Sequence, residues 1–191
     1  MNSFLGLLTI IIFILIIHLG LDSYLKIKNK HKEDLKSTID VLKVITKHEC
    51  YEKFSGDSTE FEKWIAEFLT LKGYRNVLVS PKESDDGKDI IVQNKNGETV
   101  YVSCKLSDPQ NWENNVSKSE IQKLVGSMVG DSIKAGLVIT TAALNSEAKE
   151  YIMKLNGLGY RMQIIEGDVL VKELYNLRKK HLIPLYNSVQ G

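Results

Sequence analysis

The stretch that decides the fold is Asp89–Lys105, which reads DIIVQNKNGETVYVSCK. Two apolar runs flank the pair Asn96-Gly97, and Asn-Gly favours the positive φ angles of a tight type I′ turn. The stretch therefore predicts a β-hairpin. In the second strand, alternation directs Cys104 and its apolar neighbours toward the core. The other set is expected to face away from that core, and it consists of Tyr101, Ser103 and Lys105.

The predicted hairpin brings its two ends together. Antiparallel strands pair outward from the turn, so Asp89 at the start of the first strand and Lys105 at the end of the second become neighbours. A carboxylate beside a lysine at the mouth of a sheet can hold a divalent cation and position water against a phosphate. By geometry alone, a surface ion pair is an equally good interpretation of these two residues.

Length, charge and cysteine content limit the classes of function. A chain of 191 residues has room for one domain and an appendage. Lys and Arg number 25 against 24 Asp and Glu, so no global basic charge indicates a nucleic-acid-binding protein, and any such surface must be local. Cys50 and Cys104 indicate neither a disulfide framework nor a zinc site. A reducing compartment fits them best.

Residues 1–22 predict a transmembrane anchor. Residues 4–21 are almost wholly apolar, and as a helix they span about 27 Å, close to the roughly 30 Å of bilayer hydrocarbon. A secretory signal peptide is the alternative, but no positive charge precedes the apolar run and no small-x-small cleavage site follows it. Lysines follow the run, so the N-terminus is expected outside the cell membrane and the rest of the chain in the cytoplasm.

Residues 23–57 predict a basic juxtamembrane segment. A short amphipathic helix is expected over residues 33–47, because Leu35, Ile39 and Leu42 recur at near-helical spacing. The helix is either a plain spacer, a dimerisation element or a surface that lies on the bilayer. Residues 51–57 are expected to be a linker, with Ser, Gly and Asp at its end.

Residues 58–180 predict an α/β domain. Thr59 and Glu62 match a capping box that opens a helix over residues 60–72, and Ser117 with Glu120 matches a second one. The remaining expected elements are a strand at 77–79, a turn at 84–88, a doubly buried strand at 135–140, a helix capped by Asn145, a strand at 160–165 and a helix at 169–180. Residues 181–191 are expected to form a C-terminal tail.

The order of these elements over residues 58–175 resembles the Mrr-like restriction endonucleases of the PD-(D/E)xK nuclease superfamily. The resemblance rests on the order and spacing of several motifs, namely Phe61-Glu62, Gly73-Tyr74, Gly87-Lys88-Asp89, Ser103-Cys104-Lys105, and Leu137–Thr141 before a helix with Ala148. It implies a restriction-endonuclease-like mixed sheet flanked by helices, with an αβββαβ core. It also implies hydrolysis of DNA with Mg²⁺ or Mn²⁺.

Carried over by position, the resemblance implies that Asp89 binds the metal and that Lys105 orients or activates the attacking water. It implies Glu62 as an accessory acidic residue from the first helix, although the capping box explains Glu62 equally well. Ser103 stands where the family pattern usually has Glu or Gln. A serine hydroxyl is a weaker ligand and supplies no charge to a magnesium site. Ser103 is therefore either a poor metal ligand or a bystander.

Three functions are compatible with the sequence. The leading hypothesis is a membrane-anchored, cytosol-facing DNA endonuclease that acts in restriction of foreign DNA. The second is a degenerate nuclease that binds DNA without cutting it, which Ser103 motivates. The third is a membrane-tethered interaction protein without nucleic-acid activity. The sequence decides neither whether the protein is a homodimer nor whether a separate partner recognises DNA.

Gln122, Lys123 and Trp112 are further candidates for contacts to nucleic acid. The alternative is that Gln122 and Lys123 lie on an exposed helix face and that Trp112 covers the edge of the sheet.

Overall fold

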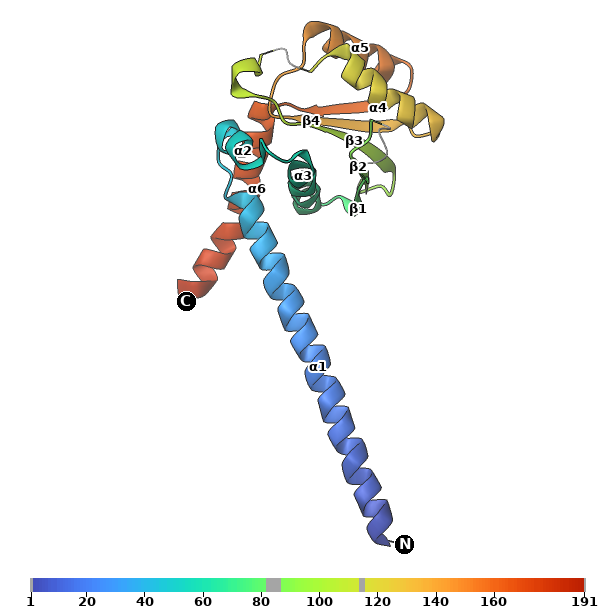
Figure 1. The fold of residues 1–191 in the computed structure, drawn as a ribbon, viewed down its shortest axis with the longest axis vertical. Helices are drawn as coiled ribbons and strands as arrows, with labels where there is room; N and C mark the ends of the chain where they lie inside the picture. Colours follow the sequence, from blue (N-terminus) through green and yellow to red (C-terminus); the bar gives the residue numbers. More distant parts are fainter. Residues whose placement is uncertain (1, 82–86, 114–115, 191) are drawn as a thin grey trace. The chain divides into compact units, whose positions relative to one another are not determined.

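The computed structural model describes the backbone of residues 2–81, 87–113 and 116–190. The chain divides into two units, Met1–Asp40 and Val41–Gly191. Helix α1 (Asn2–Leu42) supplies the first unit, and its last two residues belong to the second (Figure 1). The helix expected over residues 33–47 is thus not separate, because α1 continues through residue 42 without a break.

The predicted membrane anchor falls within α1. Among the residues that the structure describes, no helix is both long enough and apolar enough to span a bilayer. Within the predicted anchor, side chains are described for residues 13–22 only, so those of residues 1–12 lie outside the described part. The anchor at residues 1–22 remains a prediction from the sequence.

The second unit contains a five-stranded mixed sheet in the order β1-β2-β3-β4-β5. The strands are β1 (Arg75–Val79), β2 (Ile90–Gln93), β3 (Thr99–Lys105), β4 (Ala135–Thr140) and β5 (Arg161–Ile165). The pairs β1–β2 and β2–β3 are antiparallel, whereas β3–β4 and β4–β5 are parallel. With α3 (Ser58–Lys72) before β1 and α4 (Lys118–Gly130) before β4, the predicted αβββαβ order is confirmed.

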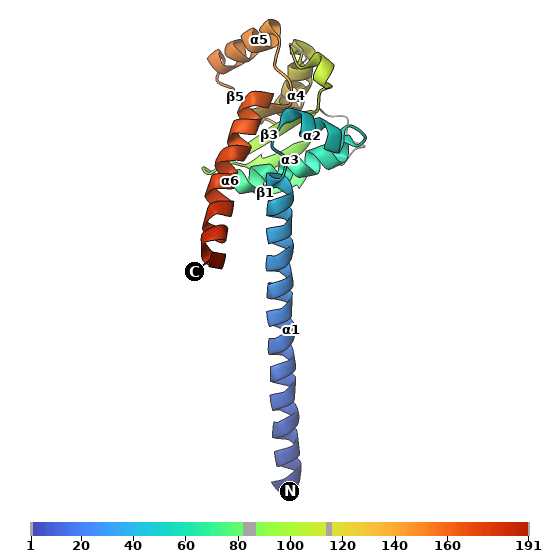
Figure 2. The same cartoon turned by 90° about the vertical axis from the view of Figure 1, so that its left-hand side faces the viewer.

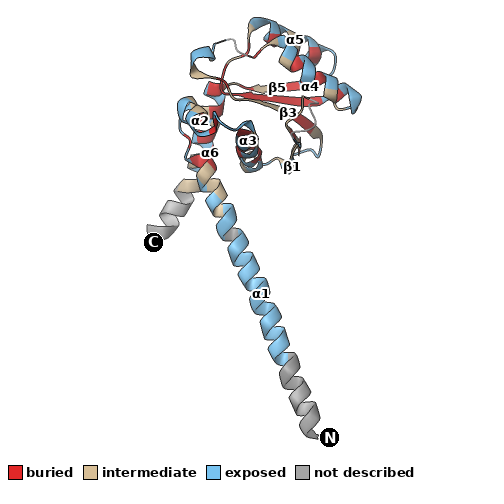
Figure 3. Ribbon diagram, viewed as in Figure 1, coloured by how far each residue is buried: buried red, intermediate tan, exposed pale blue. Residues whose placement is uncertain are grey.

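Helices cover both faces of this sheet. Helices α3 and α6 (Gly167–Gln190) lie on one face, and α4 and α5 (Ser146–Gly157) lie on the other (Figures 1 and 2). Figure 3 shows the buried residues along the strands and on the helix sides that face them. All six residues of β4 are buried, as its unbroken apolar run predicts, because the strand has a helix layer on each side.

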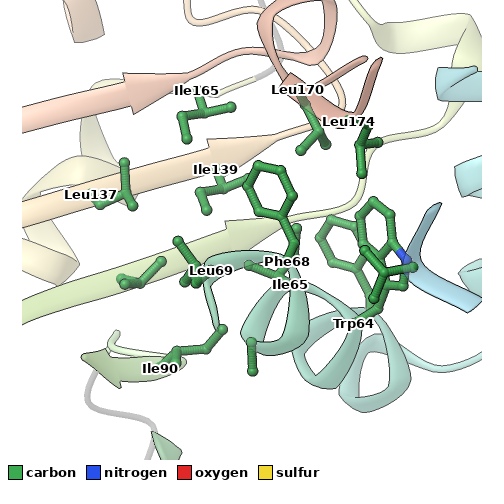
Figure 4. Packing of buried hydrophobic residues seen from close by; sticks show 14 of the residues in the cluster. Trp64, Ile65, Phe68, Leu69, Ile90, Leu137, Ile139, Ile165, Leu170 and Leu174 are labelled. Carbon is green, nitrogen blue, oxygen red and sulfur yellow. The ribbon is translucent and has the colours of Figure 1, made fainter. Parts of the chain in front are cut away.

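Each face of the sheet has its own hydrophobic core. In the first core, Trp64 and Phe68 of α3 pack with β-strand residues such as Ile139 (Figure 4). Phe61 of the same helix belongs to this core. In the second core, Tyr101 of β3 packs against residues of α4 and α5. The β3 face that carries Tyr101, Ser103 and Lys105 lies opposite the first core, as alternation predicts. Helix α4 covers only part of it, because Tyr101 is buried whereas Ser103 and Lys105 remain partly exposed.

The second unit begins earlier than the sequence indicates. The expected linker at residues 51–57 is wrong, because α2 (Lys47–Phe54) occupies most of it and buries Cys50 and Phe54. A capping box of Thr46 and Glu49 opens this helix. At the other end, α6 continues to Gln190 across the predicted tail. Over residues 47–54, the packing of apolar side chains in the core thus outweighs the local turn signals.

Two local details also differ from prediction. The hairpin turn is not a two-residue type I′ turn, since Gln93 pairs with Thr99 and residues 94–98 form the connection. The Asn94 side chain accepts hydrogen bonds from the backbone N–H groups of Asn96 (2.9 Å) and Glu98 (3.0 Å), which stabilises this longer loop. Helix α3 is capped by Asp57 rather than Thr59, because the Asp57 carboxylate accepts from the first free amides.

Candidate active site

Asp89 is held at the start of β2 by backbone hydrogen bonds to both neighbouring strands. Its carbonyl accepts from Ser80 N–H and its N–H donates to the Val102 carbonyl, each at 2.8 Å. Its carboxylate accepts from the backbone N–H of Cys104 at 2.5 Å and from the Ser103 side chain. Burial raises the pKa of Asp89 above its ordinary value, and these two hydrogen bonds offset only part of that effect.

Lys105 ends β3, and its ammonium group forms an ion pair with α4. The Lys105 Nζ atom lies 2.5 Å from Oε1 of Glu120. The second carboxylate oxygen of Glu120 accepts from the backbone N–H of Ser117 at 2.7 Å and from its hydroxyl at 3.1 Å. The hydrogen bonds from Lys105 and Ser117 outweigh the effect of burial and lower the pKa of Glu120. The ion pair that the sequence suggested with Asp89 is therefore made with Glu120.

One cavity of about 180 Å³ joins these residues. Its described lining comes mainly from the hairpin ends and from α4, and includes Gly87, Asp89, Ser103, Lys105, Glu120 and Lys123. The structure therefore brings the two predicted hairpin residues to one site, although they are not an ion pair with each other. Lys123, one of the residues considered for phosphate contacts, lies in the same lining, with its side chain exposed.

Glu62 approaches the site from the opposite face of the sheet. Burial raises the pKa of the Cys104 thiol well above its usual range, and the negative charges of Asp89 and Glu62 raise it further. Both carboxylates thus act on the same thiol. The described cavity lining does not include Glu62. Because Asp57 caps α3, the capping box does not account for Glu62.

The segment before Asp89 packs tightly on α4. Gly87 has φ of +73°, and a Cβ atom there would lie 2.9 Å from the backbone carbonyl carbon of Lys123. The next residue, Lys88, donates from Nζ to Ser127 Oγ (3.1 Å) and Asp131 Oδ2 (3.0 Å). Residues 82–86, which include most of the predicted turn, lie outside the described residues. The close contact fixes the approach of the chain to Asp89.

Comparison with known families agrees with this geometry. The model of a restriction endonuclease family, the Mrr catalytic domain, matches residues 55–174, which is more than half of the chain. The chain belongs to this restriction endonuclease family. The match covers the hairpin, the cavity and helices α3 to α5, so the fold and the site lie within the restriction endonuclease domain.

Individual relatives cover less of the molecule. The type IV methyl-directed restriction enzyme EcoKMrr of Escherichia coli (strain K12) is 31% identical over 119 residues, which is 59% of this chain and 36% of that enzyme. The chain thus spans about a third of that curated relative. A crystal structure of a protein of unknown function has a TM-score of 0.43 and 13% identity, and the match covers 60% of this chain and 65% of that one.

The contact of Glu120 with Lys105 is not predicted by the sequence. The sequence predicts Glu120 only as part of a capping box, and its carboxylate does accept from the Ser117 N–H at 2.7 Å. The second role of its carboxylate depends on α4 starting beside the end of β3, which no local pattern shows. Trp112, which the sequence suggested for contacts to nucleic acid, contacts other parts of the protein. Its Nε1–H donates to the Ser107 carbonyl at 3.1 Å, and Lys47 Nζ lies 4.7 Å from the centre of its ring.

Proposed function

We propose that this restriction endonuclease domain hydrolyses phosphodiester bonds of DNA with Mg²⁺ or Mn²⁺ and acts in restriction of foreign DNA. The observation that carries the proposal is the joining of Asp89 and Lys105 in one cavity at the two ends of one hairpin. A partly buried carboxylate with a raised pKa that lines the same cavity as a lysine is a candidate for a functional site.

The donor atoms at the cavity fit a magnesium ion that is completed by substrate. Asp89 supplies a carboxylate and Ser103 a hydroxyl, and the two side chains are already hydrogen-bonded. Mg²⁺ prefers oxygen ligands and is usually bound by one or two carboxylates together with waters and substrate phosphates. We propose Asp89 and Ser103 as the metal-binding pair, with Glu62 as an accessory carboxylate. The bound ion would polarise the scissile phosphate.

The chain's own residues supply orientation and charge. Backbone hydrogen bonds to Ser80 and Val102 hold the Asp89 main chain, so the carboxylate has a fixed position at the mouth of the sheet. The Lys105 ammonium lies in the cavity lining, where it can offset the negative charge that develops on the phosphate and donate a hydrogen bond to the attacking water.

Cleavage of supercoiled plasmid by the full chain tests this function. With Mg²⁺ or Mn²⁺ we expect nicking that EDTA abolishes, and in Asp89→Asn and Lys105→Ala we expect rates lower by about 10²–10³-fold. Lys149→Ala is the matched control, because Lys149 forms an ion pair with Glu166, outside the described cavity lining. Methylated and unmethylated plasmids are compared, since EcoKMrr is described as methyl-directed. Nicking by Asp89→Asn at the wild-type rate would contradict the mechanism.

A second candidate is a DNA-binding protein of the same fold that does not cut. Within the described residues, no group of three His, Cys, Asp or Glu side chains is placed to hold a metal ion, and Ser103 adds no charge. This function predicts salt-dependent retention of DNA without cleavage in any metal. Metal-dependent nicking would exclude it, and absence of both binding and nicking would favour the interaction protein.

The membrane anchor, the cytoplasmic location of the domain and the partners are separate proposals. They rest on the apolar sequence of residues 4–21 and on the lysines that follow it. We expect the full chain to remain in the membrane pellet after alkaline carbonate washing, with the domain accessible to protease from the cytoplasmic side. Release of the chain by the wash would contradict the anchor. Light scattering of the purified chain decides between a monomer and a homodimer.

A further inference from the structure

We infer that Glu120 is the positioning residue for Lys105, so that the start of α4 sets where the ammonium group of the site lies. The inference rests on the proposed nuclease function and adds a residue to it. Glu120 is outside the motifs that carry the family resemblance. Its carboxylate lies in the same cavity lining as Asp89, Ser103 and Lys105.

The ion pair of Glu120 with Lys105 differs from an ordinary surface pair. Such pairs usually contribute little, because two long side chains must be ordered to make one contact. Here one partner is already ordered: the second oxygen of Glu120 accepts from Ser117 N–H (2.7 Å) and from the Ser117 hydroxyl (3.1 Å). Lys105 is 43% exposed and Glu120 28% exposed, so the lysine has room to move and the carboxylate has less. The capped carboxylate therefore restricts the lysine.

Helix α4 is itself fixed relative to Asp89. Gly87, two residues before Asp89, packs against the backbone of Lys123, one turn beyond Glu120. Farther along α4, Ser127 and the C-cap residue Asp131 accept hydrogen bonds from Lys88. Both ends of the hairpin are thus bound to one helix. The contacts with α4 therefore restrict both the chain that leads into Asp89 and the ammonium group of Lys105.

This arrangement has a direct consequence for cleavage. A lysine that offsets charge on a phosphate must be held near one position, and a misplacement of about 1 Å can reduce a rate by about 100-fold. With Glu120 in place, Lys105 is directed before substrate arrives. Without it, we expect Lys105 to sample other rotamers over the cavity, while the other residues of the cavity lining stay unchanged. We therefore expect loss of Glu120 to affect turnover more than substrate binding.

Glu120→Gln tests the inference, and Glu49→Gln is the matched control. Glu49 holds the same capping-box position in α2, where its Oε2 accepts from Ile45 N–H (2.7 Å) and Thr46 N–H (3.2 Å). Both substitutions replace a capping carboxylate by a neutral amide, but only Glu120→Gln removes the charge that pairs with Lys105. For the full chain we expect kcat to fall by about 10- to 100-fold in Glu120→Gln with KM for plasmid unchanged. In Glu49→Gln we expect both constants to remain at wild-type values.

A second measurement does not depend on cleavage. Reductive methylation with formaldehyde, followed by mass spectrometry of the Lys105 peptide, reports how freely the amine reacts. We expect labelling of Lys105 to be about two- to fivefold faster in Glu120→Gln than in the wild type, which corresponds to the loss of one partly exposed ion pair. Lys105 labelling is expected to be unchanged in Glu49→Gln.

Lys105 labelling and plasmid cleavage together distinguish a failure of the positioning role from a failure of the proposed nuclease function. Unchanged Lys105 labelling in Glu120→Gln would overturn the positioning role, whatever the cleavage result. Faster labelling with a kcat no lower than that of Glu49→Gln would show that the position of Lys105 does not serve turnover, which also overturns the inference. If the wild-type chain cuts no DNA in any metal, the proposed function fails, and the inference fails with it as a catalytic role. The labelling result then decides only whether Glu120 holds Lys105.

Discussion

At the scale of single residues, Asp89 shows how a site residue acts against stability. Its carboxylate is partly buried beside β3, and this burial raises its pKa above the usual value of 3.8. The folded protein thus binds this proton more tightly than the unfolded chain does. The contribution of Asp89 to stability is fully present below the unfolded pKa and is lost as pH rises through the folded pKa. At neutral pH the ionised group destabilises the fold.

Asp89→Asn should therefore stabilise the protein near neutral pH. We expect the free energy of unfolding in urea to rise by about 0.5–2 kcal/mol at about pH 7.5, and the gain to shrink at about pH 3.5. Asp131→Asn is the control of opposite sign, because hydrogen bonds from Tyr101 and Lys88 lower the pKa of Asp131. That variant should be less stable near neutral pH. An Asp89→Asn protein less stable than the wild type at neutral pH would contradict the argument.

At the scale of elements, α4 is the scaffold of the candidate site. It contacts the start of the hairpin through Gly87 and Lys88, and the end of the hairpin through the ion pair with Lys105. Its own buried side chains, Ile121 and Leu124 among them, fix it on the second core. The hairpin and α4 therefore act as one unit, and a change at their contact should affect both stability and cleavage.

Gly87→Ala tests this contact. Its φ of +73° disfavours a side chain, and the new Cβ would also lie 2.9 Å from the Lys123 backbone, so we expect a loss of about 1–3 kcal/mol. Gly97→Ala is the matched control, since Gly97 has φ of +78° with nothing within 4 Å of a Cβ. It should show the φ penalty alone. Thermal unfolding and plasmid nicking measure the two effects, and equal losses in both variants would show that the Lys123 contact is unimportant.

At the scale of the whole molecule, the folded unit is larger than the family match. The match begins at residue 55, whereas Val41, Leu42 and Val44 are buried in the first core together with Cys50 and Phe54 of α2. Arg178 of α6 adds a clamp, since its guanidinium donates to the carbonyl oxygens of Leu42 (2.7 Å) and Val44. Residues 41–54 are therefore part of the domain and not an attachment to it.

Two fragments that start at residue 41 and at residue 58 measure how much residues 41–57 contribute to stability. We expect residues 41–191 to unfold cooperatively near the temperature of the full chain. Residues 58–191 lack several buried apolar side chains, each of which contributes about 2–5 kcal/mol, so that fragment should be strongly destabilised or unfolded. Circular dichroism on heating compares the two. If they melt at the same temperature, α2 and the preceding turn contribute nothing to the core.

The sequence by itself determined the order of elements from residue 58 onward, the hairpin and the residues at its ends, and it predicted the family. It also predicted the Ser117 start of α4, the Asn145 cap of α5 and the doubly buried β4. These features depend on interactions within about four residues, or on hydrophobic periodicity, and both are visible in a linear pattern.

Only the tertiary structure decided which of the possible capping and turn residues are used, and which residues lie beside Asp89 and Lys105. Asp57 caps α3 in place of Thr59, Asn94 sets a longer hairpin loop, and α2 replaces the expected linker. Lys105 of β3 forms an ion pair with Glu120 of α4. Neither the strand nor the helix periodicity of the sequence predicts that these two residues are neighbours. Such contacts exist because the second core packs α4 against the strand, and the free energy of that packing is shared by residues from many parts of the chain.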